Sequence, residues 1–290
     1  MMKVKKDSGR VYGVDFSSAP SRRKPITIAI GHCQGEHYRL DQVVAAPDFE
    51  AFESFLNHAG PWIAGFDLPF SLPRPLIEHY GWPSEWAEFV QWYGAQDRQE
   101  LRQLFKAFCN GRPAGGKYVY RKTDRPAGSS PAMRWTNPPV AWMAHAGAPR
   151  ILQAGLFVPG QQAIDHPPAQ ARIALEAYPG FTARQVSRSS YKSDELAKQT
   201  PERRRTRQHI LEALITGSAG LNCALMVTAT WRRHLLNDGS GDLLDAVICA
   251  LQAAHASRLP RYGFPLDLDP LEGWIASVPA APPGAFDKIG

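Results

Sequence analysis

The chain has 290 residues, 44% of them hydrophobic, which is enough for one large α/β domain or two modest ones. Lys and Arg outnumber Asp and Glu by 33 to 27, and the formal charge of +6 is compatible with a polyanionic partner without requiring one. No run approaches the roughly 18 apolar residues that a membrane span needs, and the charged first residues lack the apolar core of a signal peptide. The 4 cysteines are far apart without a Cys-x-x-Cys pair, which fits a reducing compartment better than a disulfide framework or a zinc site. We therefore expect a cytoplasmic protein with no membrane partner.

Short apolar runs near the N-terminus predict an antiparallel meander of strands at residues 10–16, 26–30 and 38–44. Phe49, Phe52 and Phe55 then recur at helical spacing, so a helix is expected to open at residues 47–52. Another apolar run, at residues 62–70, predicts a buried strand. The order strand, strand, strand, helix, strand is the opening of the ribonuclease H-like fold, although other mixed folds share parts of it.

The middle of the chain departs from this regular order. Residues 71–168 are rich in aromatic residues, expected as helices, and then in Pro and Gly, so we treat them as an insertion between core strands. A strand around Glu176, an arginine-rich helix over 200–215 and an apolar helix over 242–254 complete the core. We therefore predict a single α/β domain over residues 1–290, with a mixed sheet of antiparallel and parallel strands flanked by helices.

Carboxylates interrupt four apolar segments of this predicted core, namely Asp15, Asp67, Glu176 and the Asp242/Asp245 pair. An i, i+3 spacing places Asp242 and Asp245 on one face of their helix. Each acid alone is explained as well by a helix cap or a turn, but four such placements against apolar sequence indicate a shared site. Carboxylate oxygens are hard ligands that suit Mg²⁺ or Mn²⁺. Two such ions can orient an attacking water and stabilise the leaving oxygen of a phosphodiester.

The segments that carry these acids are Gly13-Val14-Asp15, Gly65-Phe66-Asp67-Leu68-Pro69, Glu176-Ala177-Tyr178-Pro179 and Asp242-Leu243-Leu244-Asp245-Ala246. Together they resemble the motif set of the family catalogued as domain of unknown function 429, a group of predicted nucleases of ribonuclease H-like fold. The last segment also resembles the Asp-x-x-Asp-Ala helix of Holliday-junction resolvases in the same superfamily. The matching motifs are spread over residues of about 10–250, and their order and spacing carry the resemblance.

The resemblance implies a role for each acid. Asp15, Glu176 and Asp245 would be the principal metal ligands, with Asp242 and Asp67 next, and the choice between these two stays open. Asp67 would join Asp15, Glu176 and Asp245 in the catalytic set. The implied cofactor is Mg²⁺ or Mn²⁺, and the implied substrate is nucleic acid, with DNA, RNA, a branched junction and a small nucleotide all open.

Basic residues near the Glu176 strand are candidates for substrate binding. Lys192 could place its amine near a phosphate or act as a positive partner for the acids, and its alternative is an ordinary solvated lysine. Arg203 and Arg204 could hold a nucleic-acid backbone if their helix face borders the acidic centre. Otherwise they form a solvated helix face.

Three functions remain open at this point. The first is a metal-dependent nuclease in which water attacks the phosphodiester at the carboxylate site. The second is an actin-like or sugar-kinase-like ATPase, in which Asp15, Ser17 and Ser18 would cradle phosphates, but the chain lacks a second Asp-Gly-x-Thr-type loop. The third is a nucleic-acid-binding module without catalysis.

Overall fold

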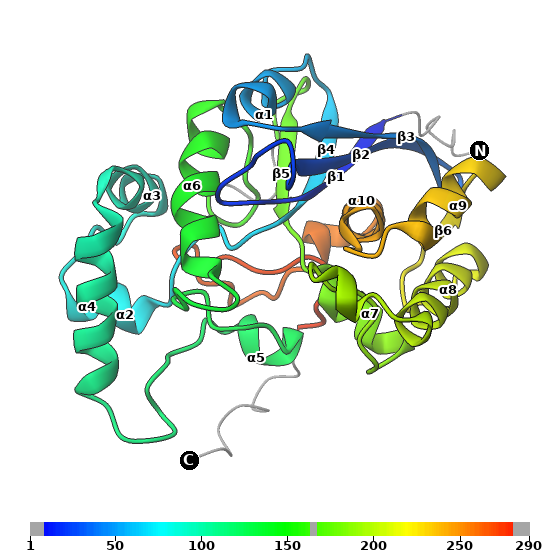
Figure 1. Cartoon of the computed structure of the whole chain (residues 1–290). Helices are drawn as coiled ribbons and strands as arrows, with labels where there is room; N and C mark the ends of the chain where they lie inside the picture. Colours follow the sequence, from blue (N-terminus) through cyan, green and yellow to red (C-terminus); the bar gives the residue numbers. More distant parts are fainter. Residues whose placement is uncertain (1–8, 163–166, 281–290) are drawn as a thin grey trace.

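Six strands form one mixed sheet in the computed structural model, which describes residues 9–162 and 167–280. Their order across the sheet is β5-β4-β1-β2-β3-β6, with helices on both faces (Figure 1). The predicted mixed α/β sheet flanked by helices is therefore confirmed. The strands are β1 (Arg10–Asp15), β2 (Ile26–Gln34), β3 (His37–Ala46), β4 (Trp62–Asp67), β5 (Arg172–Glu176) and β6 (Ala224–Met226).

Strand β1 lies in the middle of the sheet and organises the pairing around it. It runs antiparallel to β2 and parallel to β4, and β2 continues antiparallel into β3, so the predicted meander is present. Strands β4 and β5 are parallel, as are β3 and β6. Because parallel neighbours point the same way, β1, β4 and β5 all end at the same edge of the sheet.

One face of the sheet is covered by α10 (Asp242–Ala256), the predicted apolar helix, which packs across β1 and β4. Two glycines allow this close approach. A Cβ atom on Gly13 would lie 2.0 Å from the carbonyl oxygen of Ala246, and one on Gly65 would lie 2.3 Å from that of Cys249. The helix therefore lies backbone against sheet at these positions, and any larger residue would push it away.

The opposite face is covered by α1 (Phe49–Leu56) and α6 (Val140–Gln153) (Figure 1). The side chain of Asp48 accepts a hydrogen bond from the backbone N–H of Ala51 and caps α1. Phe52 and Phe55 are buried from α1, as their spacing predicts, and Phe52 packs against Phe66 of β4.

The long segment between β4 and β5 contributes five helices within the described residues: α2 (Arg74–His79), α3 (Trp86–Ala95), α4 (Arg98–Asn110), α5 (Asp124–Ala127) and α6. Its aromatic side chains pack against each other, as with Phe89 and Tyr93, whose ring centroids lie 5.5 Å apart. They belong to the same hydrophobic cluster as Tyr12 and Phe66 of the sheet. The aromatic residues of this segment therefore build core.

The remaining elements follow β5 and flank α10: α7 (Pro179–Val186), η1 (Leu196–Lys198), α8 (Pro201–Thr216), α9 (Ala229–Asn237) and η2 (Pro260–Gly263). Helix α8 is the predicted arginine-rich helix, capped by Thr200 with Pro201 in its first turn. The last described residues pass back along the edge where β5 ends, where the N–H of Ala276 donates to the carbonyl of Glu176 at 2.8 Å. Within the described part of the chain, every helix is too short or too polar to span a membrane.

Candidate functional site

Asp15 and Asp67 occupy the last positions of two adjacent parallel strands. The register pairs Asp15 directly with Asp67, so both side chains leave the sheet on the same face. Gly13 and Gly65 lie two residues earlier on the same face, beneath α10. The two carboxylates therefore lie side by side, next to the N-terminal turns of α10.

Neither of these two carboxylates is paired. Across residues 9–162 and 167–280, no group donates a hydrogen bond to Asp15 or Asp67, and neither forms an ion pair. Both are partly buried. A partly buried carboxylate without a partner costs free energy, so two of them together need a cation or a proton.

Asp245 faces these two acids from the first turn of α10. Its side chain is fully buried, and Tyr191 donates its hydroxyl to Oδ1 at 2.5 Å. The ammonium of Lys192 forms an ion pair with the other oxygen, Oδ2. Tyr191 is itself held in place, because the buried Arg207 of α8 donates from Nη1 to its carbonyl at 2.6 Å. The arginine-rich helix therefore touches the site through Arg207.

Asp242 opens α10 beside the cluster, with 16% of its side chain exposed. It is not the helix cap, because Asp238 accepts the N–H of Leu243 at 2.9 Å and Gly241 occupies the cap position. Lys24 belongs to the β1–β2 connection, and its Nζ atom lies 3.7 Å from Oδ1 of Asp242. The same ammonium also pairs with Asp194. Asp242 is thus a further acid of the same cluster, partly compensated by a lysine.

The electrostatics of the cluster reflect an excess of negative charge. Burial raises the pKa of Asp15 well above its ordinary value, and the charges of Asp245, Asp242 and Asp67 raise it further, while Lys192 opposes them. Burial likewise raises the pKa of Asp67 to about 7. Burial alone would lower the pKa of Lys192, but the negative groups around it, Asp245 foremost, together outweigh burial and raise the pKa. We call Asp15, Asp67, Asp242 and Asp245 the acidic cluster.

Glu176 does not share this arrangement, contrary to the expectation that it would join Asp15 and Asp245. The register pairs Glu176 with Phe66, so its side chain leaves the sheet on the face opposite Asp67. There it is 4% exposed and engaged at both oxygens by the guanidinium of Arg121, at 2.5 and 2.7 Å, and by the N–H of Phe70 at 3.1 Å. A metal-ligand role for Glu176 stays a prediction, and it would require Arg121 to release an oxygen.

The sequence does not indicate Arg121 as a site residue, although its guanidinium occupies both oxygens of Glu176. Arg121 is 2% exposed and also pairs with the buried Asp124. Residues 121 and 176 are 55 positions apart, and an arginine in a Pro- and Gly-rich stretch gives no local signal of burial. We call Arg121, Asp124 and Glu176 the paired cluster.

Comparison with known families gives one match. The family described as "Protein of unknown function (DUF429)" matches residues 13–265. The chain belongs to this family. Comparison of the chain with curated proteins and with solved structures gives no match.

The matched region includes every acid of both clusters. The ligand chemistry of the acidic cluster suits a hard divalent cation, because the cluster offers carboxylate oxygens. Two of its carboxylates, those of Asp15 and Asp67, are unpaired among the described residues. Within the residues described, however, no group of three or more His, Cys, Asp or Glu side chains is spaced to hold a metal ion. The fit is therefore one of charge and ligand chemistry, and the carboxylates would have to draw closer around a cation.

Arg203 and Arg204 lie on α8. Arg204 is exposed and donates to Asn237 at 3.3 Å, while Arg203 is partly buried. Neither contacts a carboxylate of the acidic cluster among the interactions of the described residues. Their role in binding substrate stays a prediction.

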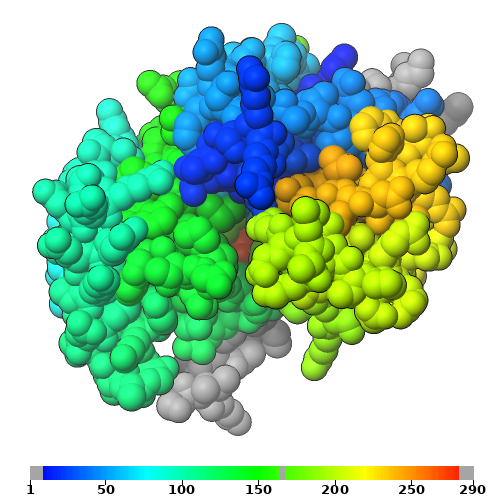
Figure 2. Space-filling model, viewed as in Figure 1, coloured from blue at the N-terminus to red at the C-terminus, as the bar shows by residue number. Residues whose placement is uncertain are grey.

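A small cavity of about 60 Å³ lies at the edge of the sheet where β4 and β5 end. Its lining includes Asp67, Glu176, Ser129, Tyr178 and Ile275. Figure 2 shows the surface hollowed where green, yellow-green and dark-blue segments meet, with red at the floor. The lining of the cavity comes from parts of the chain that carry the green, yellow-green and red colours of this hollow, together with the end of β4.

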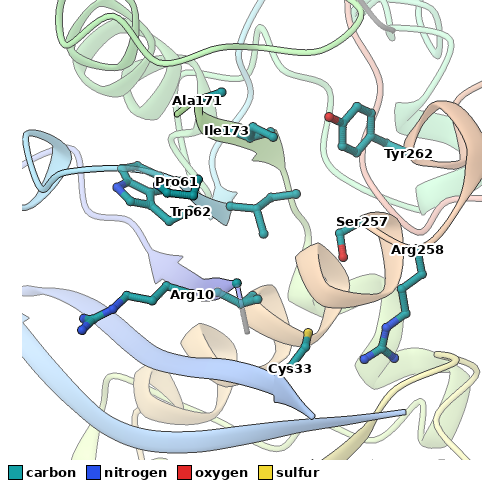
Figure 3. Close-up of a pocket in the computed structure, with 12 residues that line it drawn as sticks. Arg10, Cys33, Pro61, Trp62, Ala171, Ile173, Ser257, Arg258 and Tyr262 are labelled. Atoms are coloured by element: carbon teal, nitrogen blue, oxygen red, sulfur yellow. The ribbon is translucent and has the colours of Figure 1, made fainter. Parts of the chain in front are cut away.

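A larger cavity of about 540 Å³ lies at the other ends of the strands (Figure 3). Arg10 and Trp62, which begin β1 and β4, line it together with Ile173, Ser257 and Tyr262. Among the residues that the structure describes, no carboxylate side chain lines it. This cavity is the larger of the two, but the unpaired acids lie at the opposite edge of the sheet, so we place the candidate functional site there.

Proposed function

We propose that this protein is a cytoplasmic metal-dependent nuclease, which hydrolyses a phosphodiester bond of nucleic acid at the acidic cluster. The observation that carries the proposal is the pair of unpaired carboxylates, Asp15 and Asp67, side by side at the ends of two parallel strands. Asp245 faces them from α10, and Asp242 lies beside it. A ligand that supplies positive charge would relieve their mutual repulsion.

The arrangement of the sheet supports a ribonuclease H-like fold for the chain. Strands β1, β2 and β3 form an antiparallel meander, α1 follows, and β4 then pairs in parallel with β1. This is the order that characterises the opening of that fold. In such a sheet the central strand places its terminal acid at the edge shared with β4, where the cluster lies.

Mg²⁺ or Mn²⁺ would be held by Asp15, Asp67 and Asp245, with Asp242 as a further ligand. Such an ion supplies an activated water and charge stabilisation at the scissile phosphate. The protein groups have separate tasks. Tyr191 orients the carboxylate of Asp245 through its hydroxyl, and Arg207 fixes Tyr191. Lys192 provides a cation within reach of a bound phosphate.

This assignment replaces Glu176 by Asp67 as the third acid of the centre. Asp67 faces Asp15 and is unpaired, whereas Glu176 is satisfied by Arg121. The paired cluster would then shape the wall of the hollow, next to the catalytic acids.

A cleavage assay tests the proposal. Single-stranded and double-stranded DNA and RNA and a four-way DNA junction are incubated with the full chain and Mg²⁺ or Mn²⁺. We expect cleavage of at least one substrate, and its rate should fall at least about a hundredfold in Asp15→Asn and Asp67→Asn. Asp41→Asn is the matched control, because Asp41 is an exposed acid on β3 that pairs with His32.

Two results would contradict the proposal. Cleavage that persists at the wild-type rate in Asp15→Asn and Asp67→Asn would place the activity elsewhere. Nucleic-acid binding without cleavage of any substrate, unchanged by Asp15→Asn, would instead support a binding module without catalysis.

A further inference from the structure

Lys192 holds the position in the acidic cluster that a cation would need. Its ammonium pairs with Oδ2 of Asp245, and its charge also acts on Asp15, Asp67 and Asp242. The other oxygen of Asp245 is taken by the hydroxyl of Tyr191. Both oxygens of Asp245 therefore already accept a donor, and the ammonium of Lys192 occupies the side of Oδ2 that a metal ion would compete for.

From this geometry we propose that Lys192 is a built-in counter-ion, displaced from Asp245 when a divalent cation binds the acidic cluster. The inference rests on the proposed function. The displaced ammonium would then be available to a phosphate oxygen of the substrate. Lys192 would thus have two alternative ionic partners. Without metal its ammonium pairs with Asp245, and with metal bound it pairs with a phosphate oxygen of the substrate.

The local structure makes room for the lysine. Lys192 lies in the connection between α7 and η1, and its stem runs past Gly241 at the start of α10. A Cβ atom on Gly241 would lie 2.7 Å from the Cβ atom of Lys192, and Gly241 has a φ of +81°. A glycine here serves both the left-handed turn and the passage of the lysine stem.

The lysine can also leave without unfolding its surroundings. Its side chain keeps 41% of its surface exposed, whereas Asp245 is fully buried on a helix. Lys192 belongs to no helix or strand, and its neighbour Tyr191 is fixed separately by Arg207. The ammonium can therefore turn toward solvent while the acids stay in position.

Competition between Lys192 and a metal has a measurable consequence. If the two cations exclude each other at Asp245, removing one must tighten binding of the other. Lys192→Met keeps the stem and removes the charge. Lys192→Arg keeps the charge. Lys198→Met is the matched control, because Lys198 lies on η1 six positions later, is exposed, and pairs with Glu195.

The experiment is calorimetric titration of the full chain with Mn²⁺ alone, with no nucleic acid present. We expect the Mn²⁺ dissociation constant of Lys192→Met to fall about tenfold relative to wild type. Lys192→Arg and Lys198→Met should stay within about twofold of wild type, because both keep a cation at Asp245. Thermal melting in EDTA confirms that each variant is folded, and Lys192→Gln is the second neutral variant should Lys192→Met fail to fold.

The outcomes separate this inference from the proposed function. Mn²⁺ affinity that is unchanged or weaker in the folded neutral variants would overturn the counter-ion role, while a site that binds Mn²⁺ would remain. No Mn²⁺ binding by the wild type or by any lysine variant would overturn the metal site itself, and the counter-ion role with it.

Discussion

Two groups of buried acids lie at one edge of the same sheet, and they differ in what balances them. In the paired cluster, Arg121 lies between Glu176 and Asp124, and every oxygen of Glu176 has a donor. In the acidic cluster, Asp15 and Asp67 have no donor among the described residues, and Lys192 compensates only Asp245 directly. Burial is common to both groups. The unbalanced charge is what distinguishes a site poised for a ligand from one that holds the fold together.

The largest effect is expected from breaking the paired cluster. Arg121→Met leaves Glu176 and Asp124 buried without a cation, which should lower the free energy of unfolding by about 3–5 kcal/mol. Urea denaturation measures this. Arg125→Met is the control, because Arg125 is exposed on α5 and stacks on Tyr120, and it should cost less than about 1 kcal/mol. An Arg121→Met protein within about 1 kcal/mol of wild type would mean that the paired cluster does not stabilise the fold.

Neutralising one acid in each cluster should change the free energy of unfolding in opposite directions. Glu176→Gln loses charge-assisted hydrogen bonds to Arg121 and should destabilise the metal-free protein by about 2 kcal/mol. Asp67→Asn removes an unpaired charge that repels Asp245 and should stabilise it by about 1 kcal/mol. Both values come from denaturation at pH 8 in EDTA. Shifts of the same sign in the two variants would erase the distinction between the clusters.

The pH dependence of stability follows from the raised pKa of Asp67. Its ordinary value of 3.8 rises to about 7 in the fold, so the folded state binds a proton more tightly than the unfolded chain. This stabilising contribution is complete below about pH 4 and is lost as the pH rises through about 7. Asp67→Asn should remove it, so the difference in unfolding free energy between variant and wild type should grow from pH 5 to pH 8 in EDTA. A difference independent of pH over this range would show that Asp67 titrates normally.

The smallest effect is expected at Arg203 and Arg204 on α8. The double variant Arg203→Gln/Arg204→Gln should weaken oligonucleotide binding about threefold at low salt. The slope of the logarithm of the binding constant against the logarithm of the salt concentration should become shallower by about one to two, as expected for the loss of one to two phosphate contacts. Fluorescence anisotropy at several salt concentrations measures both. Arg102→Gln/Lys106→Gln makes the same charge change on the exposed face of α4 in the insertion. Equal losses in the two double variants would indicate general charge attraction with no preferred face.

Much of the framework could be predicted from the sequence because it depends on local patterns. The meander, the phenylalanine face of α1 and the apolar helix α10 each follow from the periodicity of short segments. The acids Asp15, Asp67 and Asp245 stand out for the same reason, since each interrupts an apolar run.

The partners of these acids could not be predicted in the same way. Whether Glu176 faces Asp67 or turns away depends on which residues pair across β4 and β5, and a shift of one position reverses the answer. Arg121 reaches Glu176 across 55 positions, and Lys192 reaches Asp245 across 53. Such contacts depend on the tertiary fold, so the sequence could name Lys192 as a partner of the acids without choosing between that role and a solvated one.

Anomalous diffraction from crystals of the full chain soaked in Mn²⁺ tests the central claim most directly. The account predicts a manganese peak between Asp15, Asp67 and Asp245, with the ammonium of Lys192 moved away from Asp245 and the pair between Arg121 and Glu176 intact. A manganese peak bound to Glu176 with Arg121 displaced, or no peak at the acidic cluster in crystals that diffract well, would contradict it.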